Sequence, residues 1–155
     1  MAKPKVALYW NASCGGCEEA WVDLNEDILK VADAVDIVLW PVALDFKRKD
    51  LEAMEDGEIA VAFLNGGVRT SEQMEWAELL RRKSQLVIAF GACAHLGGIP
   101  GLANFYDREG LMQSSYETGP SVDNPGKTRP QLSTEMPEGE LELPELWDRV
   151  HALDQ

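Results

Sequence analysis

The sequence predicts an α/β fold built on an open, doubly wound, mostly parallel sheet with helices on both faces. Four short apolar runs, each long enough for one strand, alternate with segments whose apolar residues recur every three or four positions. The runs are apolar on both sides, as expected of parallel strands covered by helices above and below. This alternation is typical of repeated β-α-β units. The predicted strands are residues 6–10, 35–40, 59–64 and 86–90.

Four helices are predicted between and after these strands. In the first, Glu18 and Glu19 lie in the opening turn, where the helix dipole favours negative charge. Ser71 is the expected N-cap of the third helix, and Pro144 suits the first position of the last. The predicted helical segments are residues 17–31, a short stretch within 45–54, residues 71–83 and residues 144–153.

Size and charge exclude several classes of protein. A chain of 155 residues is the size of one domain and can bury a core without disulfide bonds. Its 27 acidic and 14 basic residues give a net charge of −13, which argues against binding to nucleic acid or anionic lipid. No apolar run has the length of a membrane span or the form of a signal peptide. We therefore expect a soluble, cytoplasmic protein.

Residues 107–143 differ in character from the rest of the chain. This stretch has few apolar residues and is punctuated by proline and glycine, as in Gly119-Pro120 and Asn124-Pro125-Gly126. Loops of this length are uncommon inside a domain and usually signal function, partner contact or disorder. We expect a long irregular segment that contacts a partner.

Three cysteines carry the chemistry of the sequence. Cys14 and Cys17 follow the first predicted strand, and Cys93 follows the fourth. Doubly wound sheets bind ligands outside the carboxyl ends of their strands, so the topology predicts that the three thiols meet at one edge. Three cysteines are too few for a secreted disulfide framework. Thiolates suit iron-sulfur clusters, zinc or copper(I), and we interpret this edge as an iron-sulfur site.

Other residue types near the cysteines fit such a site. Glycines allow close backbone approach and leave amides free to bind cluster sulfides. His95, two residues after Cys93, is expected beside a ligand rather than as one. Glu19 is a candidate proton-transfer group, although a solvated acid at a helix N-terminus is the simpler interpretation. The glycines assigned to the site are Gly15, Gly16, Gly91, Gly97 and Gly98.

Two other functions remain open from the residues alone. Cys14 and Cys17 form a C-x-x-C pair next to a helix, as in thioredoxin-like dithiol oxidoreductases. Cys93 would then be a small buried hydrophobic residue. Alternatively, the chain is a non-catalytic docking module that binds its partner through residues 107–143.

Three stretches of the chain together resemble the small subunit of nickel-iron hydrogenases. They are residues 14–19 (CGGCEE), 89–95 (AFGACAH) and 97–104 (GGIPGLAN). The likeness runs through essentially the whole chain and is greatest to the cytoplasmic F420-non-reducing, or methyl-viologen-reducing, branch, which works with heterodisulfide reductase. More distantly, the chain is similar to the 20 kDa subunit of respiratory complex I.

The resemblance implies a fold, a cofactor and partners. It implies one flavodoxin-like domain over residues 1–155 that holds a proximal [4Fe-4S] cluster, with Cys14, Cys17 and Cys93 as three of its ligands and Glu19 in proton transfer. The nickel-iron site would lie in a separate large subunit, which passes electrons to this cluster, and heterodisulfide reductase-type subunits would be further partners. In the family, the fourth ligand and a further cluster domain lie beyond the position of Gln155, so the resemblance implies a truncated chain.

Overall fold

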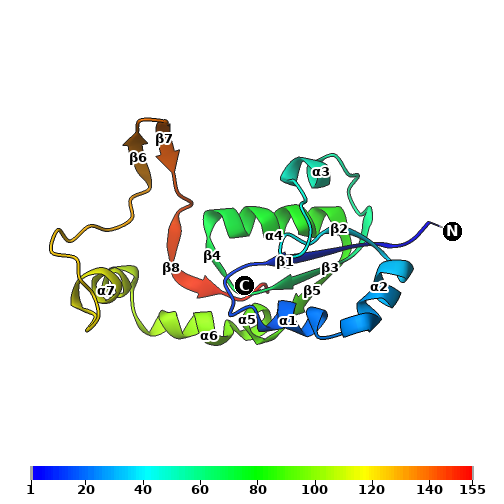
Figure 1. Ribbon diagram of the computed structural model, residues 1–155, viewed down its shortest axis with the longest axis horizontal. Coiled ribbons are helices and arrows are strands. Elements are labelled where there is room, and N and C mark those ends of the chain that lie inside the picture. Colours follow the sequence, from blue (N-terminus) through cyan, green and yellow to red (C-terminus); the bar gives the residue numbers. More distant parts are fainter. Residues whose placement is uncertain (1, 155) are drawn as a thin grey trace.

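The computed structural model describes residues 2–154 and confirms the predicted α/β fold. Four parallel strands form one sheet in the order β2-β1-β3-β5 (Figure 1). This is the flavodoxin-like order, in which the chain changes direction across the sheet between β1 and β3, the position where such folds bind ligands. The strands are β1 (Lys5–Trp10), β2 (Asp36–Leu39), β3 (Ile59–Asn65) and β5 (Ser84–Phe90).

Helices cover both faces of this sheet, and the core is divided accordingly. On one face, Val6 and Leu8 of β1 join a buried cluster that packs against Trp21 of α1 (Gly16–Val22) and Ile28 of α2 (Ile28–Ala34). On the other face, Ala7 joins a cluster with residues of α3 (Arg48–Glu52) and α4 (Ser71–Lys83). Because side chains alternate along a strand, β1 contributes to both clusters, which confirms the two-sided burial predicted for it.

The single helix predicted over residues 17–31 is two helices. Asn25 has a φ of +49° and begins a short 3₁₀ turn, η1 (Asn25–Asp27), between α1 and α2. Asparagine tolerates this left-handed conformation because its short side chain bonds locally, and here the amide donates to the carbonyl of Asp23 at 2.8 Å. The apolar spacing continues through the break, which is why the sequence did not show it.

The helix predicted over residues 71–83 is confirmed as α4, but its N-cap is one residue earlier. The Thr70 hydroxyl accepts from the Gln73 amide at 3.3 Å, and the Gln73 side chain accepts from the Thr70 amide at 3.1 Å. This reciprocal pair is a capping box. Ser71 instead pairs with Glu145, accepting from its backbone N–H through the hydroxyl and donating its own N–H to the Glu145 carbonyl.

The predicted last helix is wrong, because residues 146–151 form a strand. This strand, β8 (Leu146–His151), pairs antiparallel with β4 (Val68–Thr70), a short strand that was not predicted. Its Val150 is buried against Gly67 and exchanges two backbone bonds with the Asn104 side chain, at 2.8 and 2.9 Å. Pairing with a distant segment outweighs the local helical spacing of Leu146, Trp147 and Val150.

The chain after β5 turns through short helices. They are α5 (Ala92–Leu96), α6 (Gly98–Gly101) and the 3₁₀ turn η2 (Leu102–Phe105). The Ala94 carbonyl accepts from Leu153 at 2.9 Å, so the end of the described chain lies against α5. No helix within residues 2–154 combines the length and the apolar character needed to span a membrane.

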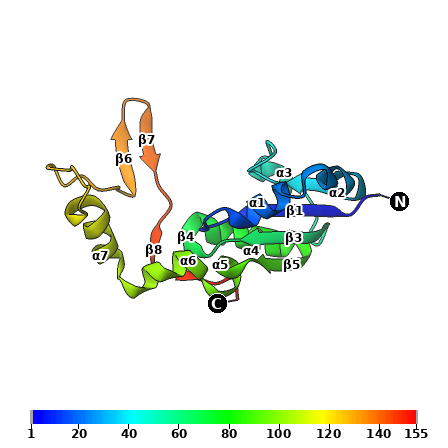
Figure 2. The same cartoon turned by 60° about the horizontal axis from the view of Figure 1, so that its bottom comes forward.

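Residues 107–143 contain more regular structure than predicted. The segment starts with α7 (Arg108–Gln113) and a single π-helical turn, η3 (Ser114–Thr118). After an irregular stretch comes a hairpin of β6 (Ser133–Met136) and β7 (Gly139–Glu142). Figures 1 and 2 show this hairpin projecting away from the sheet in both views, and every residue of both strands is exposed.

Candidate functional site

The three cysteines lie at the carboxyl ends of β1 and β5, as the strand positions predicted. Cys14 is exposed in the turn before α1, and Cys17 is half-buried in the first turn of that helix. Cys93 lies in α5, directly after β5, and is 7% exposed. β3 lies between the two strands that deliver these residues. All three thiols are free rather than paired in a disulfide.

Each thiol lies beside a glycine, and a larger residue at that position would bring a side chain into contact with the sulfur. A Cβ atom at Gly91 would lie 2.2 Å from the sulfur of Cys17, and one at Gly98 would lie 2.8 Å from that of Cys93. A Cβ atom at Gly16 would lie 3.6 Å from the sulfur of Cys14. Cys17 thus contacts the backbone two residues before Cys93, although the two are far apart in sequence.

Two of the assigned glycines shape the backbone itself. Gly15 has a φ of +87° and caps α1, and a Cβ atom there would meet the ring of Trp10 at 3.0 Å. Gly97 has a φ of +84° and joins α5 to α6. Left-handed conformations of this kind are open to glycine and costly for other residues.

The surroundings of Cys17 favour its protonated form in the absence of a cation. Burial raises the pKa of Cys17, and the neighbouring charges of Cys93, Cys14 and Glu18 raise that pKa further. Both other thiols therefore act electrostatically on Cys17. A bound metal reverses the effect, because it stabilises thiolates and releases their protons.

The turn that carries Cys14 is anchored to the end of β3. The Ser13 hydroxyl accepts from the Gly15 amide at 3.1 Å and donates to the side-chain oxygen of Asn65 at 2.8 Å. Ala12 and Gly67 exchange two backbone bonds at 2.8 and 2.9 Å. The sequence did not identify Ser13 or Asn65, and only the position of Asn65 at the end of a strand could have suggested it.

The two acidic residues after Cys17 have opposite environments. Glu18 is 4% exposed, and its carboxylate accepts from the indole N–H of Trp40 at 2.5 Å and from the amide of Asn65 at 2.7 Å. Glu19, the residue predicted for proton transfer, is exposed. Sequence reasoning therefore missed the buried carboxylate, because neighbouring residues of a helix point in different directions and composition does not show which one faces inward.

His95 is exposed on α5, two residues after Cys93. Within residues 2–154, no three His, Cys, Asp or Glu side chains are arranged around a point where a single metal ion could sit. A [4Fe-4S] cluster differs from a single ion because each thiolate binds a different iron atom.

Asn11, at the end of β1, is 5% exposed, and its side-chain amide has no hydrogen-bond partner in the described chain. A buried polar group of this kind is rare and needs an explanation.

Comparison with known proteins identifies the family. Residues 14–135, more than half of the chain, match the family described as NADH ubiquinone oxidoreductase, 20 Kd subunit. The chain belongs to this family. The matched region starts at Cys14 and includes both cysteine-bearing segments, and the resemblance to the complex I subunit predicted from the motifs is thereby confirmed.

Proteins similar in sequence to this chain include hydrogenase subunits. The iron-sulfur subunit of the F420-non-reducing hydrogenase of Archaeoglobus profundus is 42% identical over 152 residues, which is 97% of this chain and 47% of that protein. A subunit of the F420-non-reducing hydrogenase of Methanothermobacter thermautotrophicus is 35% identical over 74% of this chain and 35% of that protein. This chain therefore spans about half, or less, of the length of these relatives.

A solved structure from a hydrogenase shares the fold. A chain in the crystal structure of an NAD⁺-reducing [NiFe]-hydrogenase in the H2-reduced state superposes with a TM-score of 0.79 and 30% sequence identity. The match covers 98% of this chain and 76% of that one. The predicted similarity to nickel-iron hydrogenase subunits is confirmed by sequence and by structure.

Proposed function

We propose that this chain is the electron-transfer subunit of a cytoplasmic nickel-iron hydrogenase and holds a [4Fe-4S] cluster through Cys14, Cys17 and Cys93. The observation that carries the proposal is the set of three free thiols at one sheet edge, each bordered by a glycine. Thiolates are the preferred ligands of such clusters. The relative named as a hydrogenase iron-sulfur subunit agrees with it.

The residues present fit the proposed group. A side chain at Gly91 or Gly98 would collide with a thiol, so glycine at these positions leaves room beside the sulfurs. The sequence holds only three cysteines, and the fourth ligand would come from outside these 155 residues. When bound, the cluster supplies a one-electron carrier between the hydrogen-activating site and an acceptor. Glu19, which is exposed and two residues from Cys17, would take part in proton transfer.

The position of Cys93 favours this function over the dithiol alternative. A thioredoxin-like mechanism works through two thiols alone, the first of them activated by the helix N-terminus. Such a mechanism gives no role to Cys93, whose charge is one of the causes that raise the pKa of Cys17.

We propose that the partner is a large subunit that carries the nickel-iron site and binds the hairpin arm, residues 132–143. Opposed residues of an antiparallel pair share a face. Glu135 lies opposite Glu140 on one face, whereas Thr134 lies opposite Leu141 on the other. The apolar face continues to the base of the hairpin, and its large side chains are 47–60% exposed: Leu132, Met136, Leu141 and Leu143.

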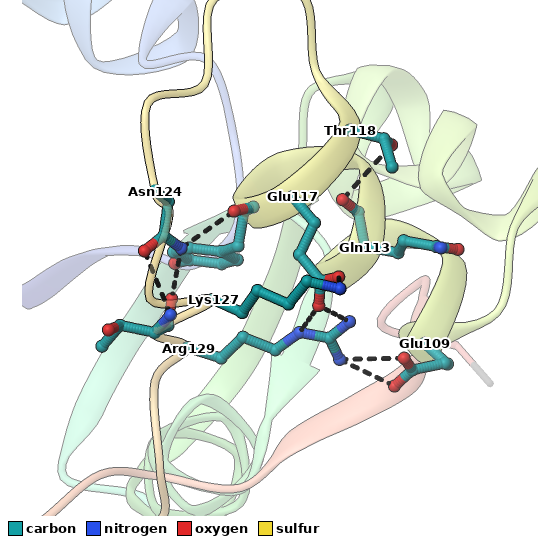
Figure 3. A network of polar contacts seen from close by, with 9 residues as sticks. Glu109, Gln113, Glu117, Thr118, Asn124, Lys127 and Arg129 are labelled. Carbon is teal, nitrogen blue, oxygen red and sulfur yellow. Dashed lines mark hydrogen bonds and ion pairs between the residues drawn. The ribbon is translucent and has the colours of Figure 1, made fainter.

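The base of the hairpin arm opens into an apolar groove. This hollow of about 430 Å³ lies between α7 and the arm and is lined by Met112, Tyr116, Leu132 and Leu143, among others. Figure 3 shows how one wall is fixed: Arg129 donates to Glu117 at 2.8 Å and to both carboxylate oxygens of Glu109 at 2.9 and 3.0 Å. These bonds hold residues after η3 against α7.

The charge of the arm indicates what kind of partner surface can bind it. Residues 132–143 include four acidic residues and no basic one. A two-stranded hairpin with one uncovered apolar face is marginally stable alone. The arm therefore suits an apolar surface rimmed by lysine and arginine, and a second copy of this chain, which carries the same negative charge, suits it poorly. Heterodisulfide reductase-type subunits would accept electrons at another surface.

A charge on the apolar face of the arm is expected to weaken this contact. Leu141→Glu should raise the dissociation constant for the purified large subunit by about tenfold or more, because a carboxylate would be buried without a partner. Ser133→Glu, which adds the same charge on the opposite face, is the matched control. Biolayer interferometry measures both. Equal affinities for the two variants would refute the role of the arm.

The function is tested by hydrogen-dependent reduction. The anaerobically purified protein is mixed with its large subunit under hydrogen, and the visible absorbance of the cluster is followed. We expect bleaching only when the large subunit is present. Protein that contains iron but does not bleach would contradict the electron-transfer role, and catalysis of disulfide exchange by iron-free protein would favour the dithiol alternative.

A further inference from the structure

Glu18 is a buried carboxylate with hydrogen-bond donors and no cation. Its two oxygens accept from Trp40 at 2.5 Å and from Asn65 at 2.7 Å. None of the ion pairs within residues 2–154 involves it. Burying a charge without an opposite charge is costly, so a fold that keeps one has a use for it.

The contacts of Glu18 join two strand ends to the cysteine turn. Trp40 follows β2, and Asn65 ends β3, so the carboxylate on α1 holds both. Asn65 in turn accepts from Ser13, whose hydroxyl accepts from the Gly15 amide. A continuous chain of hydrogen bonds therefore runs from the buried carboxylate to the backbone between Cys14 and Cys17.

We propose that Glu18 positions the turn that carries Cys14 and Cys17 and that its buried negative charge lowers the reduction potential of the cluster held there. This inference rests on the proposed function. Glu18 directly follows a proposed ligand and is shielded from water, so its charge is poorly screened. A negative charge close to a cluster disfavours the arrival of an electron, and hydrogen bonds around the ligands adjust the same potential.

An isosteric variant separates the charge from the positioning. In Glu18→Gln, the new side-chain oxygen can still accept from the indole N–H of Trp40. The new side-chain nitrogen can donate to the side-chain oxygen of Asn65 once the Asn65 side-chain amide has rotated by half a turn. Asn65 then donates to the Ser13 hydroxyl, which has a second lone pair free to accept it. Each pair of residues stays hydrogen-bonded, with the direction of the bonds from residue 18 to Asn65 and from Asn65 to Ser13 reversed, and the charge is lost.

The measurement is a redox titration of the anaerobically purified, cluster-containing protein, followed by electron paramagnetic resonance. We expect Glu18→Gln to raise the midpoint potential by about 59 mV or more. This shift corresponds to a tenfold or larger change in the one-electron reduction equilibrium. Asp23→Asn removes one charge from an exposed residue at the end of the same helix and should leave the potential near that of the wild type.

A second variant tests the positioning. Glu18→Ala leaves the donors of Trp40 and Asn65 without acceptors, and changes in groups that orient ligands typically cost about 10–100-fold in metal affinity. We expect it to lose iron to a chelator at least about tenfold faster than Glu18→Gln. Wild-type protein without iron would overturn the proposed function and this inference together. Iron-containing variants with an unchanged potential and unchanged iron loss would overturn this inference alone.

Discussion

Cys93→Ser is expected to abolish stable iron binding while leaving the fold in place. Cys93 is buried at the end of β5, so no other thiol can take its position. Serine has nearly the same shape, but its oxygen is a poor ligand for iron in a sulfur cluster. Iron and acid-labile sulfide in the anaerobically purified variant should fall to background values, while far-ultraviolet circular dichroism stays unchanged.

The control for Cys93→Ser is a change of the neighbouring residue. Ala92→Ser introduces the same hydroxyl one position earlier, at an exposed site of α5, and should retain the iron content of the wild type. If Cys93→Ser kept its full iron content, Cys93 would be the small buried hydrophobic residue that the sequence also allowed. The ligand set proposed for the cluster would then be wrong.

Gly91→Ala is expected to lower both stability and cluster content. Gly91 has a φ of +86° and a ψ of 169°, a conformation open essentially only to glycine, and adopting it costs other residues about 1–3 kcal/mol. The added methyl group would also lie 2.2 Å from the sulfur of Cys17, so that sulfur must move. Thermal unfolding should occur at a lower temperature, and the iron content per chain should fall.

Gly101→Ala is the matched control for this backbone effect. Gly101 has a φ of −64°, and a Cβ atom there would meet nothing within 4 Å. Alanine at this helical position should leave stability equal to that of the wild type or slightly higher, by up to about 1 kcal/mol. Two variants with equal melting temperatures and equal iron contents would show that the contact between Gly91 and Cys17 is unimportant.

The parallel sheet could be predicted because each of its strands is recognisable from its own short stretch of sequence. Each of its strands is an apolar run buried on both faces, and the helices between them keep regular apolar spacing. The pairing of β8 with β4 could not be predicted in this way. β4 is three residues long, and its partner lies about half the chain away, so nothing near Leu146 or Val150 in sequence distinguishes a strand from a helix.

The candidate site also has one part that could be predicted from local sequence and one part that could not. The positions of Cys14, Cys17 and Cys93 at strand ends follow from the order of elements, and the fold then brings them to one edge. The burial of Glu18 depends on where Trp40 and Asn65 come to lie, which is a property of the assembled sheet. For that reason the sequence analysis named Glu19 as a candidate functional residue and did not name Glu18.

The central claim is that the thiols at the ends of β1 and β5 together bind an iron-sulfur cluster. Electron paramagnetic resonance of the anaerobically purified protein, reduced with dithionite and combined with iron and sulfide analysis, tests it most directly. We predict the signal of a reduced [4Fe-4S] cluster, with iron and sulfide in equal amounts. Full-length, correctly folded protein that shows neither iron nor this signal would contradict the claim.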